Sequence, residues 1–64
     1  MRNTDRIYPF CYRLAELWMR YCPDWRFTQL IDNIQSYYQS DLFYVEDADL
    51  MEKIENYFIN VFEE

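Results

Sequence analysis

The 64-residue sequence contains no histidine and no glycine, and each absence excludes a class of chemistry or structure. Histidine is the commonest general base and metal ligand, so its absence removes the Ser-His and Cys-His nucleophile pairs and most zinc sites. Without glycine, turns and helix ends must be made by two prolines and by Asp, Asn and Ser residues. We therefore expect a protein with no catalytic activity, no cofactor and no metal site.

Acidic residues are the remaining candidates for catalysis or metal binding. Those between residues 49 and 55 fall on one predicted helix, where we expect them to be solvated and not enclosed in a cleft. Asp41 and Glu52 have the spacing of the first and last ligands of an EF-hand loop. Phe43, however, occupies a ligand position, and Glu46 stands where the loop requires glycine. Helix capping and solubility explain these acids better than catalysis or calcium binding.

The chain also lacks a closely spaced cysteine pair and a long apolar run. Cys11 and Cys22 fall in or at the end of one predicted helix, in which eleven residues span about 16 Å. A disulfide needs α-carbons within about 7 Å, so we expect two reduced thiols. The N-terminal segment is polar, and no stretch approaches the roughly 20 apolar residues of a membrane span. These features predict a cytoplasmic protein.

What the sequence does contain is a high proportion of apolar side chains, 52% of all residues, with 22% aromatic. A domain of this size buries only about 60% of the surface that its unfolded chain exposes, so large aromatic side chains matter for its stability. We expect one helical domain spanning residues 1–64, with helices at about 6–21, 25–38 and 47–62. Helix 1 should begin at Thr4 or Asp5 as N-cap, with Pro9 in its first turn, and should end before Pro23.

Helix 1 carries two apolar stripes. The stronger one follows the three-and-four spacing of a helix face and consists of Ile7, Phe10, Leu14, Leu17, Trp18 and Tyr21. Tyr8, Tyr12 and Met19 form a second stripe, about 100° to 140° around the helix from Ile7, with Ala15 among them. This second stripe is either core against helix 3 or an exposed contact patch. Because helix 1 is apolar over more than half its circumference, we expect it to be the central helix.

The other two helices have one apolar stripe each. Asp24 should cap helix 2, and Asp47 or Glu46 should cap helix 3. Between them, Leu42 to Val45 suits an extended segment that has no second strand to pair with, so we interpret it as a packed linker. The architecture predicted is an all-α three-helix bundle. Its expected core consists of Leu14, Leu17, Trp18, Leu30, Ile34, Ile54 and Phe58.

Four sequence words, in order along the chain, carry a resemblance. They are Arg-Ile-x-Pro-Phe (6–10), Leu-Trp (17–18), Pro-Asp-Trp-Arg-Phe-x-Gln-Leu-Ile (23–31) and Asp-x-Phe-Tyr-x-Glu-Asp (41–47). In these words the chain resembles a group of short uncharacterised bacterial and phage proteins over nearly its whole length. The resemblance implies a cytosolic setting, and a phage origin, but no chemistry and no site residue.

Basic and acidic residues are concentrated in different parts of the chain. Residues 1–26 hold five arginines against three acids, a net +2, while residues 27–64 hold nine acids against one lysine, a net −8, which together give −6. An acidic half of this kind indicates a basic partner and disfavours direct binding of nucleic acid. Arg6, Arg13 and Arg20 recur every seven residues, so they form either a phosphate-binding stripe or ion pairs with the acidic helix 3.

Two classes of function fit this sequence. The first is a small acidic interaction module that binds a larger protein with a basic surface; its most concrete form is a phage-encoded inhibitor of a host defence nuclease, acting by surface occlusion or nucleic-acid mimicry. The second is a homo-oligomeric accessory or structural subunit, for instance a homodimer, that associates through the tyrosine face of helix 1. The predicted partner-binding residues are Asp41, Glu46, Asp47, Asp49, Glu52 and Glu55 for the first class and Tyr8, Tyr12 and Met19 for the second.

Overall fold

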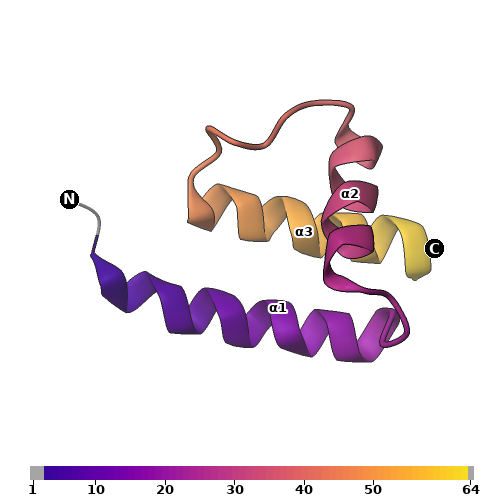
Figure 1. Cartoon of the computed structure of the whole chain (residues 1–64), viewed down its shortest axis with the longest axis horizontal. Coiled ribbons are helices and arrows are strands. Elements are labelled where there is room, and N and C mark those ends of the chain that lie inside the picture. Colours follow the sequence, from indigo (N-terminus) through magenta and orange to yellow (C-terminus); the bar gives the residue numbers. More distant parts are fainter. Residues whose placement is uncertain (1–2, 64) are drawn as a thin grey trace.

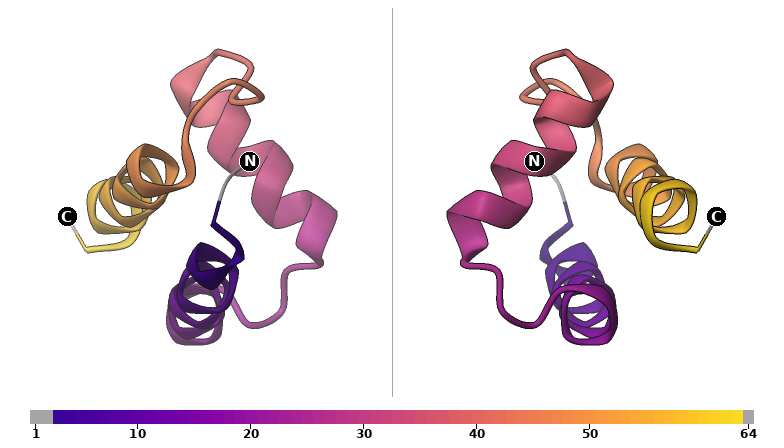
Figure 2. Two further views of the ribbon diagram at one scale, coloured as in Figure 1. Left: turned by 90° about the vertical axis from the view of Figure 1, so that its left-hand side faces the viewer. Right: turned by 90° about the vertical axis from the view of Figure 1, so that its right-hand side faces the viewer.

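The computed structural model describes residues 3–63, which form a short 3-10 turn and three α-helices (Figure 1). The turn is η1 (Thr4–Arg6), and the helices are α1 (Ile7–Tyr21), α2 (Phe27–Tyr38) and α3 (Asp47–Phe62). None of residues 3–63 lies in a β-strand. Seen end-on, α1 and α3 run in the same direction, and α2 is inclined across them (Figure 2). The predicted all-α three-helix bundle is confirmed.

The N-terminal ends of α1 and α2 are built differently from the prediction. Before α1, the side chain of Asn3 caps η1 by accepting a hydrogen bond from the backbone N–H of Asp5 at 2.9 Å. The segment at Asp24 is a turn, so α2 begins two residues later than predicted and Asp24 does not cap it. The backbone N–H of Arg26, the residue before α2, instead donates to Oε1 of Gln29 at 2.8 Å.

The core is formed by all three helices and by two residues outside them. Phe58 and Leu30 are fully enclosed. Leu14 and Trp18, which were predicted to be core, are only half-buried, whereas Cys22 at the end of α1 and Leu42 in the linker join the core. The buried residues are Leu17, Cys22, Leu30, Ile34, Leu42, Ile54, Tyr57 and Phe58.

The central helix is α3 and not α1, so this part of the prediction is wrong. α3 packs against both other helices and contributes three buried residues, whereas α1 contributes only Leu17. The prediction failed because it assumed that both apolar stripes of α1 would be covered. The inclination of α2 brings α2 and α1 onto α3, and one whole side of α1 stays in solvent (Figure 2).

Aromatic and hydrogen-bond contacts hold α3 to its neighbours. The rings of Tyr21 on α1 and Phe58 stack with centroids 5.1 Å apart. The hydroxyl of Tyr38, at the end of α2, donates a hydrogen bond to the backbone carbonyl of Lys53 at 2.6 Å, and the Lys53 ammonium lies 4.7 Å from the centre of the Tyr38 ring. Burial raises the pKa of the Tyr38 hydroxyl, which keeps it protonated as a donor.

No helix within residues 3–63 combines the length and the apolar character needed to cross a membrane.

Candidate interaction surfaces

The three arginines of the predicted stripe form a ladder of ion pairs with the acidic half of the chain, which we call the arginine ladder. It exists because α1 and α3 run in the same direction, so successive turns of one helix face successive turns of the other. The pairs are Arg6 with Asp47 (3.1 Å), Arg13 with Glu55 (2.6 Å) and Arg20 with Glu63 (3.6 Å). The hydrogen bond to Glu55 raises the pKa of the Arg13 guanidinium. The interpretation of the stripe as internal ion pairs is confirmed.

Three of the six acids predicted to contact a partner have side-chain contacts within the fold, and a fourth, Glu46, stands at a helix N-cap without a side-chain capping hydrogen bond. Asp47 and Glu55 belong to the arginine ladder. Asp41 accepts a hydrogen bond from the backbone N–H of Phe43 at 2.9 Å, which fixes the turn in the linker. Glu46 is the N-cap residue of α3.

The other two predicted acids, Asp49 and Glu52, lie exposed on the outer side of α3. Within residues 3–63 no ion pair or hydrogen bond is made by their side chains. They line a shallow polar surface together with Lys53 and Asn56. The fold thus places two of the six acids in the ladder, two in or at the end of the linker, and two on the outside of α3.

The second stripe of α1 is exposed, so of its two interpretations the one as core is wrong. The exposed fractions are 73% for Tyr8, 68% for Tyr12 and 74% for Met19. The rings of Tyr8 and Tyr12 stack on one another with centroids 6.1 Å apart. Together with Ala15, these side chains form an apolar strip that we call the outer face of α1. It points away from α2 and α3.

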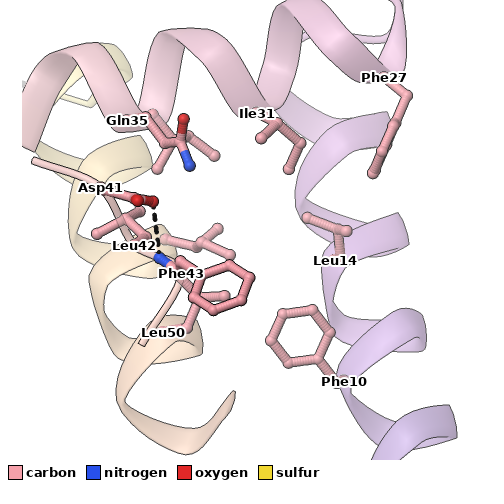
Figure 3. Close-up of a pocket in the computed structure, with 11 residues that line it drawn as sticks. Phe10, Leu14, Phe27, Ile31, Gln35, Asp41, Leu42, Phe43 and Leu50 are labelled. Atoms are coloured by element: carbon pink, nitrogen blue, oxygen red, sulfur yellow. Dashed lines mark hydrogen bonds between the residues drawn. The ribbon is translucent and has the colours of Figure 1, made fainter. Parts of the chain in front are cut away.

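A second apolar surface, which the sequence did not indicate, is a cavity of about 250 Å³ where the three helices and the linker meet (Figure 3). We call it the apolar groove. In Figure 3 side chains from α1, α2 and the linker converge on it from three directions. Its lining residues are Phe10 and Leu14 from α1; Phe27, Ile31, Ile34 and Gln35 from α2; Asp41, Leu42 and Phe43 from the linker; and Leu50 and Ile54 from α3.

The linker holds its side chains in fixed positions around this groove. Leu42 is buried, and its carbonyl accepts a hydrogen bond from the backbone N–H of Val45 at 3.1 Å. This turn, together with the bond from Phe43 to Asp41, directs the ring of Phe43 outward, where it is 76% exposed and forms one wall of the groove (Figure 3). The prediction of a packed linker is thus correct for Leu42 and Val45 but wrong for Phe43 and Tyr44.

The charged side chains nearest to the groove are mostly acidic. Asp41 is the only charged residue among those that line it. Along α2 the groove continues into a shallow depression that includes Gln29 and Asp32. Among residues 3–63 no lysine or arginine lines either surface, and the arginine nearest to the groove is Arg6, in the adjoining hollow beside Phe43. The groove is therefore an apolar site with an acidic rim.

Neither surface, within residues 3–63, carries a group of side chains suited to bind a metal ion. Within residues 3–63, no three Cys, Asp or Glu side chains are grouped so that they could hold a metal ion. Comparisons with models of protein families, with curated proteins and with solved structures found no match to this chain. The two apolar surfaces and the exposed charges are therefore the candidate contact sites of this chain.

Proposed function

We propose that this chain is a small, non-catalytic interaction module that binds a larger protein by holding one of its apolar side chains in the apolar groove. The observation that carries the proposal is the groove itself, in which Phe43 stands largely exposed beside an apolar cavity although a folded chain gains by burying such a ring. An aromatic wall fixed by a hydrogen-bonded turn is typical of a preformed contact site, because little entropy is lost when the partner binds.

The size of the groove favours a protein partner over a small molecule. Sites for small molecules and cofactors have volumes of about 300–1,000 Å³ and enclose most of the ligand. The groove, at about 250 Å³, lies below that range and is only partly enclosed. A cavity of this size suits one bulky side chain of a partner, the arrangement found at the centre of many protein interfaces.

Charge selects the kind of partner. The chain has a net charge of −6, and the groove has Asp41 at its lining and Asp32 nearby. Arg6, in the adjoining hollow that shares Phe43, is paired with Asp47. A segment in which lysine or arginine flanks the apolar anchor complements this site, whereas an acidic segment is repelled. Asp49 and Glu52, exposed on α3, add to the field that attracts such a partner.

In its concrete form, the proposal is a phage-encoded inhibitor that acts in the host cytoplasm on a defence nuclease. Small size, net negative charge and exposed acids support it. Since the arginine ladder engages Asp47 and Glu55, we favour occlusion of the nuclease through the groove over mimicry of nucleic acid by the acids. The same ladder pairs Arg6, Arg13 and Arg20, which argues against direct binding of nucleic acid by the chain itself.

Site-specific photocrosslinking in cells of the host tests this function. A photoreactive phenylalanine analogue at position 43 should capture one protein with a basic surface, and the same analogue at the exposed position of Asn56 on α3 should capture it much less. With the captured protein purified, Phe43→Ser should weaken binding at least tenfold, whereas Ile59→Ser, at an exposed residue of α3 outside the groove, should not. Equal effects of the two substitutions would contradict the proposal.

The exposed acids are tested separately through kinetics. Charges at the rim of an interface change the association rate and its dependence on salt more than the dissociation rate. Reversal of Asp49 and Glu52 to lysine should therefore slow association and reduce its salt dependence, while Phe43→Ser should mainly speed dissociation. If the charge reversals leave the association rate and its salt slope unchanged, steering by these acids is refuted.

A further inference from the structure

The residues of the outer face of α1 are spaced symmetrically along the helix: the intervals between them are the same when read from either end. Its members Tyr8, Tyr12, Ala15 and Met19 are separated by four, three and four residues. The centre of the pattern lies between Arg13 and Leu14. A half-turn about an axis through that centre, perpendicular to the helix, superposes the four positions on themselves in reverse order. This is the symmetry of two identical antiparallel helices.

The residue types at these positions match one another under that symmetry. In an antiparallel pair, Tyr8 lies against Met19 of the second copy, and Tyr12 lies against Ala15 of the second copy. The first contact joins an aromatic ring and a thioether, which attract one another. The second joins a large side chain and a small one, which lets the helices approach closely. Spacings of four and three also place the four residues on one seam, as in a coiled coil.

We propose that a second copy of this chain covers the outer face of α1, with the two α1 helices antiparallel. The faces are exposed to 68–74% at Tyr8, Tyr12 and Met19. With about 150–250 Å² available per large side chain, the three residues offer roughly 400 Å² per copy, or about 800 Å² per dimer. Ala15 and the flanking atoms of Cys11 and Glu16 bring the area toward about 1,000 Å², in the range of weak, transient interfaces and below the roughly 1,200 Å² of stable ones. The dimer is therefore weak and concentration-dependent.

The distribution of charge supports this occupant. Two copies of a chain with a net charge of −6 repel one another, and the acids of residues 27–64 account for that charge. α1 contains a single acid, Glu16, and its outer face points away from α3. Contact through α1 therefore brings together the least acidic sides of the two copies. It also separates the acidic elements by the width of two helices, beyond the Debye length of about 10 Å at 0.1 M salt.

The dimer leaves the apolar groove open, so this inference does not depend on the proposed function. Phe10 and Leu14 line the groove from the side of α1 that faces α2 and the linker, roughly opposite the outer face. Two antiparallel copies consequently present two grooves, one on each side of the helix pair. Such an arrangement binds a repeated or dimeric partner more tightly than one copy does, provided that both grooves can be engaged together.

Sedimentation with a charge-pair design tests both the dimer and its orientation. The purified chain should self-associate with increasing concentration, and Tyr8→Glu or Met19→Lys alone should weaken the association at least tenfold. The double variant should regain it, because each Glu at position 8 meets the Lys at position 19 of the other copy. Glutamate near the start of α1 and lysine near its end are both favoured by the helix dipole, so helicity should be unchanged.

Three outcomes overturn the proposal. The first is a chain that stays monomeric at every concentration that remains soluble. The second is a dimer that either single substitution leaves intact, which would place the interface elsewhere. The third is a double variant that associates no better than the single variants, which is the result for parallel helices because like charges then meet. Phe43→Ser is the matched control: it alters the groove and should leave the self-association unchanged.

Discussion

Two isoleucines on α3 allow the packing of the core to be tested with one chemical change at two depths. Ile54 is 2% exposed and lies within the core, while Ile59, on the same helix, is 51% exposed. Replacement of either by alanine removes the same three carbon atoms and changes the helix propensity by the same amount. The difference between the two variants therefore isolates the effect of burial.

The expected magnitudes follow from that difference in exposure. At about 0.8 kcal/mol per buried methylene, Ile54→Ala loses about 2.4 kcal/mol of transfer free energy, and the remaining cavity brings the loss to about 3–4 kcal/mol. Ile59→Ala loses only about half of the transfer free energy and leaves no cavity. Because alanine also has the better helix propensity, the expected loss in free energy of unfolding is about 0.5–1 kcal/mol. A domain of this size has roughly 3–10 kcal/mol in total.

Urea denaturation followed by far-ultraviolet circular dichroism measures both values on the same scale. Ile54→Ala should lower the free energy of unfolding by at least 2 kcal/mol more than Ile59→Ala. The Ile54 variant should be close to the limit of stability, so its unfolded baseline should extend to low urea concentrations. Equal losses from the two substitutions would show that α3 does not occupy the centre of the bundle in solution.

The remaining predictions concern thiols, pH and the arginine ladder. Both cysteines should be reduced, and Cys11, which is exposed, should be alkylated much faster than the buried Cys22; a slow reaction at both would contradict the exposure of α1. Burial raises the pKa of the Cys22 thiol and that of the Tyr57 hydroxyl above their ordinary values, so the unfolded chain ionises first, and the free energy of unfolding should fall as the pH rises above about 9. A flat stability profile from pH 8 to about 11 would refute this. Arg13→Glu should destabilise the fold through repulsion from Glu55, and a second change, Glu55→Arg, should restore part of the loss if the two side chains meet as described.

The helices were predictable because their signals are local. Proline positions and the three-and-four spacing of apolar residues correctly predict that α1 ends at Tyr21 and that α3 runs from Asp47 to Phe62. The start of α2 was missed because Asp24 is a favourable N-cap in isolation, whereas in the fold the Trp18 indole donates to the carbonyl of Trp25 at 3.0 Å and holds this segment in a turn. The central position of α3 was not predictable from stripe width, since it depends on how α2 crosses the bundle.

The candidate surfaces were only partly predictable. The arginine spacing indicated the ladder, and the second stripe of α1 indicated an exposed patch, although it fitted a core position equally well. The apolar groove was missed because its walls come from four separate segments, and no pattern within one segment marks such a site. Its one local signal is Phe43, an aromatic residue directly after the buried Leu42, and a linker that is packed throughout would bury both side chains.

The most direct test of the central claim, that the apolar groove binds a basic segment through an apolar anchor, is a nuclear magnetic resonance titration of the isotope-labelled chain. The probe is a short synthetic peptide of lysine and alanine with one central phenylalanine; the controls replace that phenylalanine by alanine, or the lysines by glutamate. The methyl signals of Leu14, Ile31 and Leu42, which line the groove, should shift with the probe and much less with either control. Phe43→Ser should abolish most of the shift. Equal shifts with the peptide that lacks phenylalanine, or shifts confined to α3 around Glu52, would show that charge alone attracts the peptide and that the groove is not the binding site.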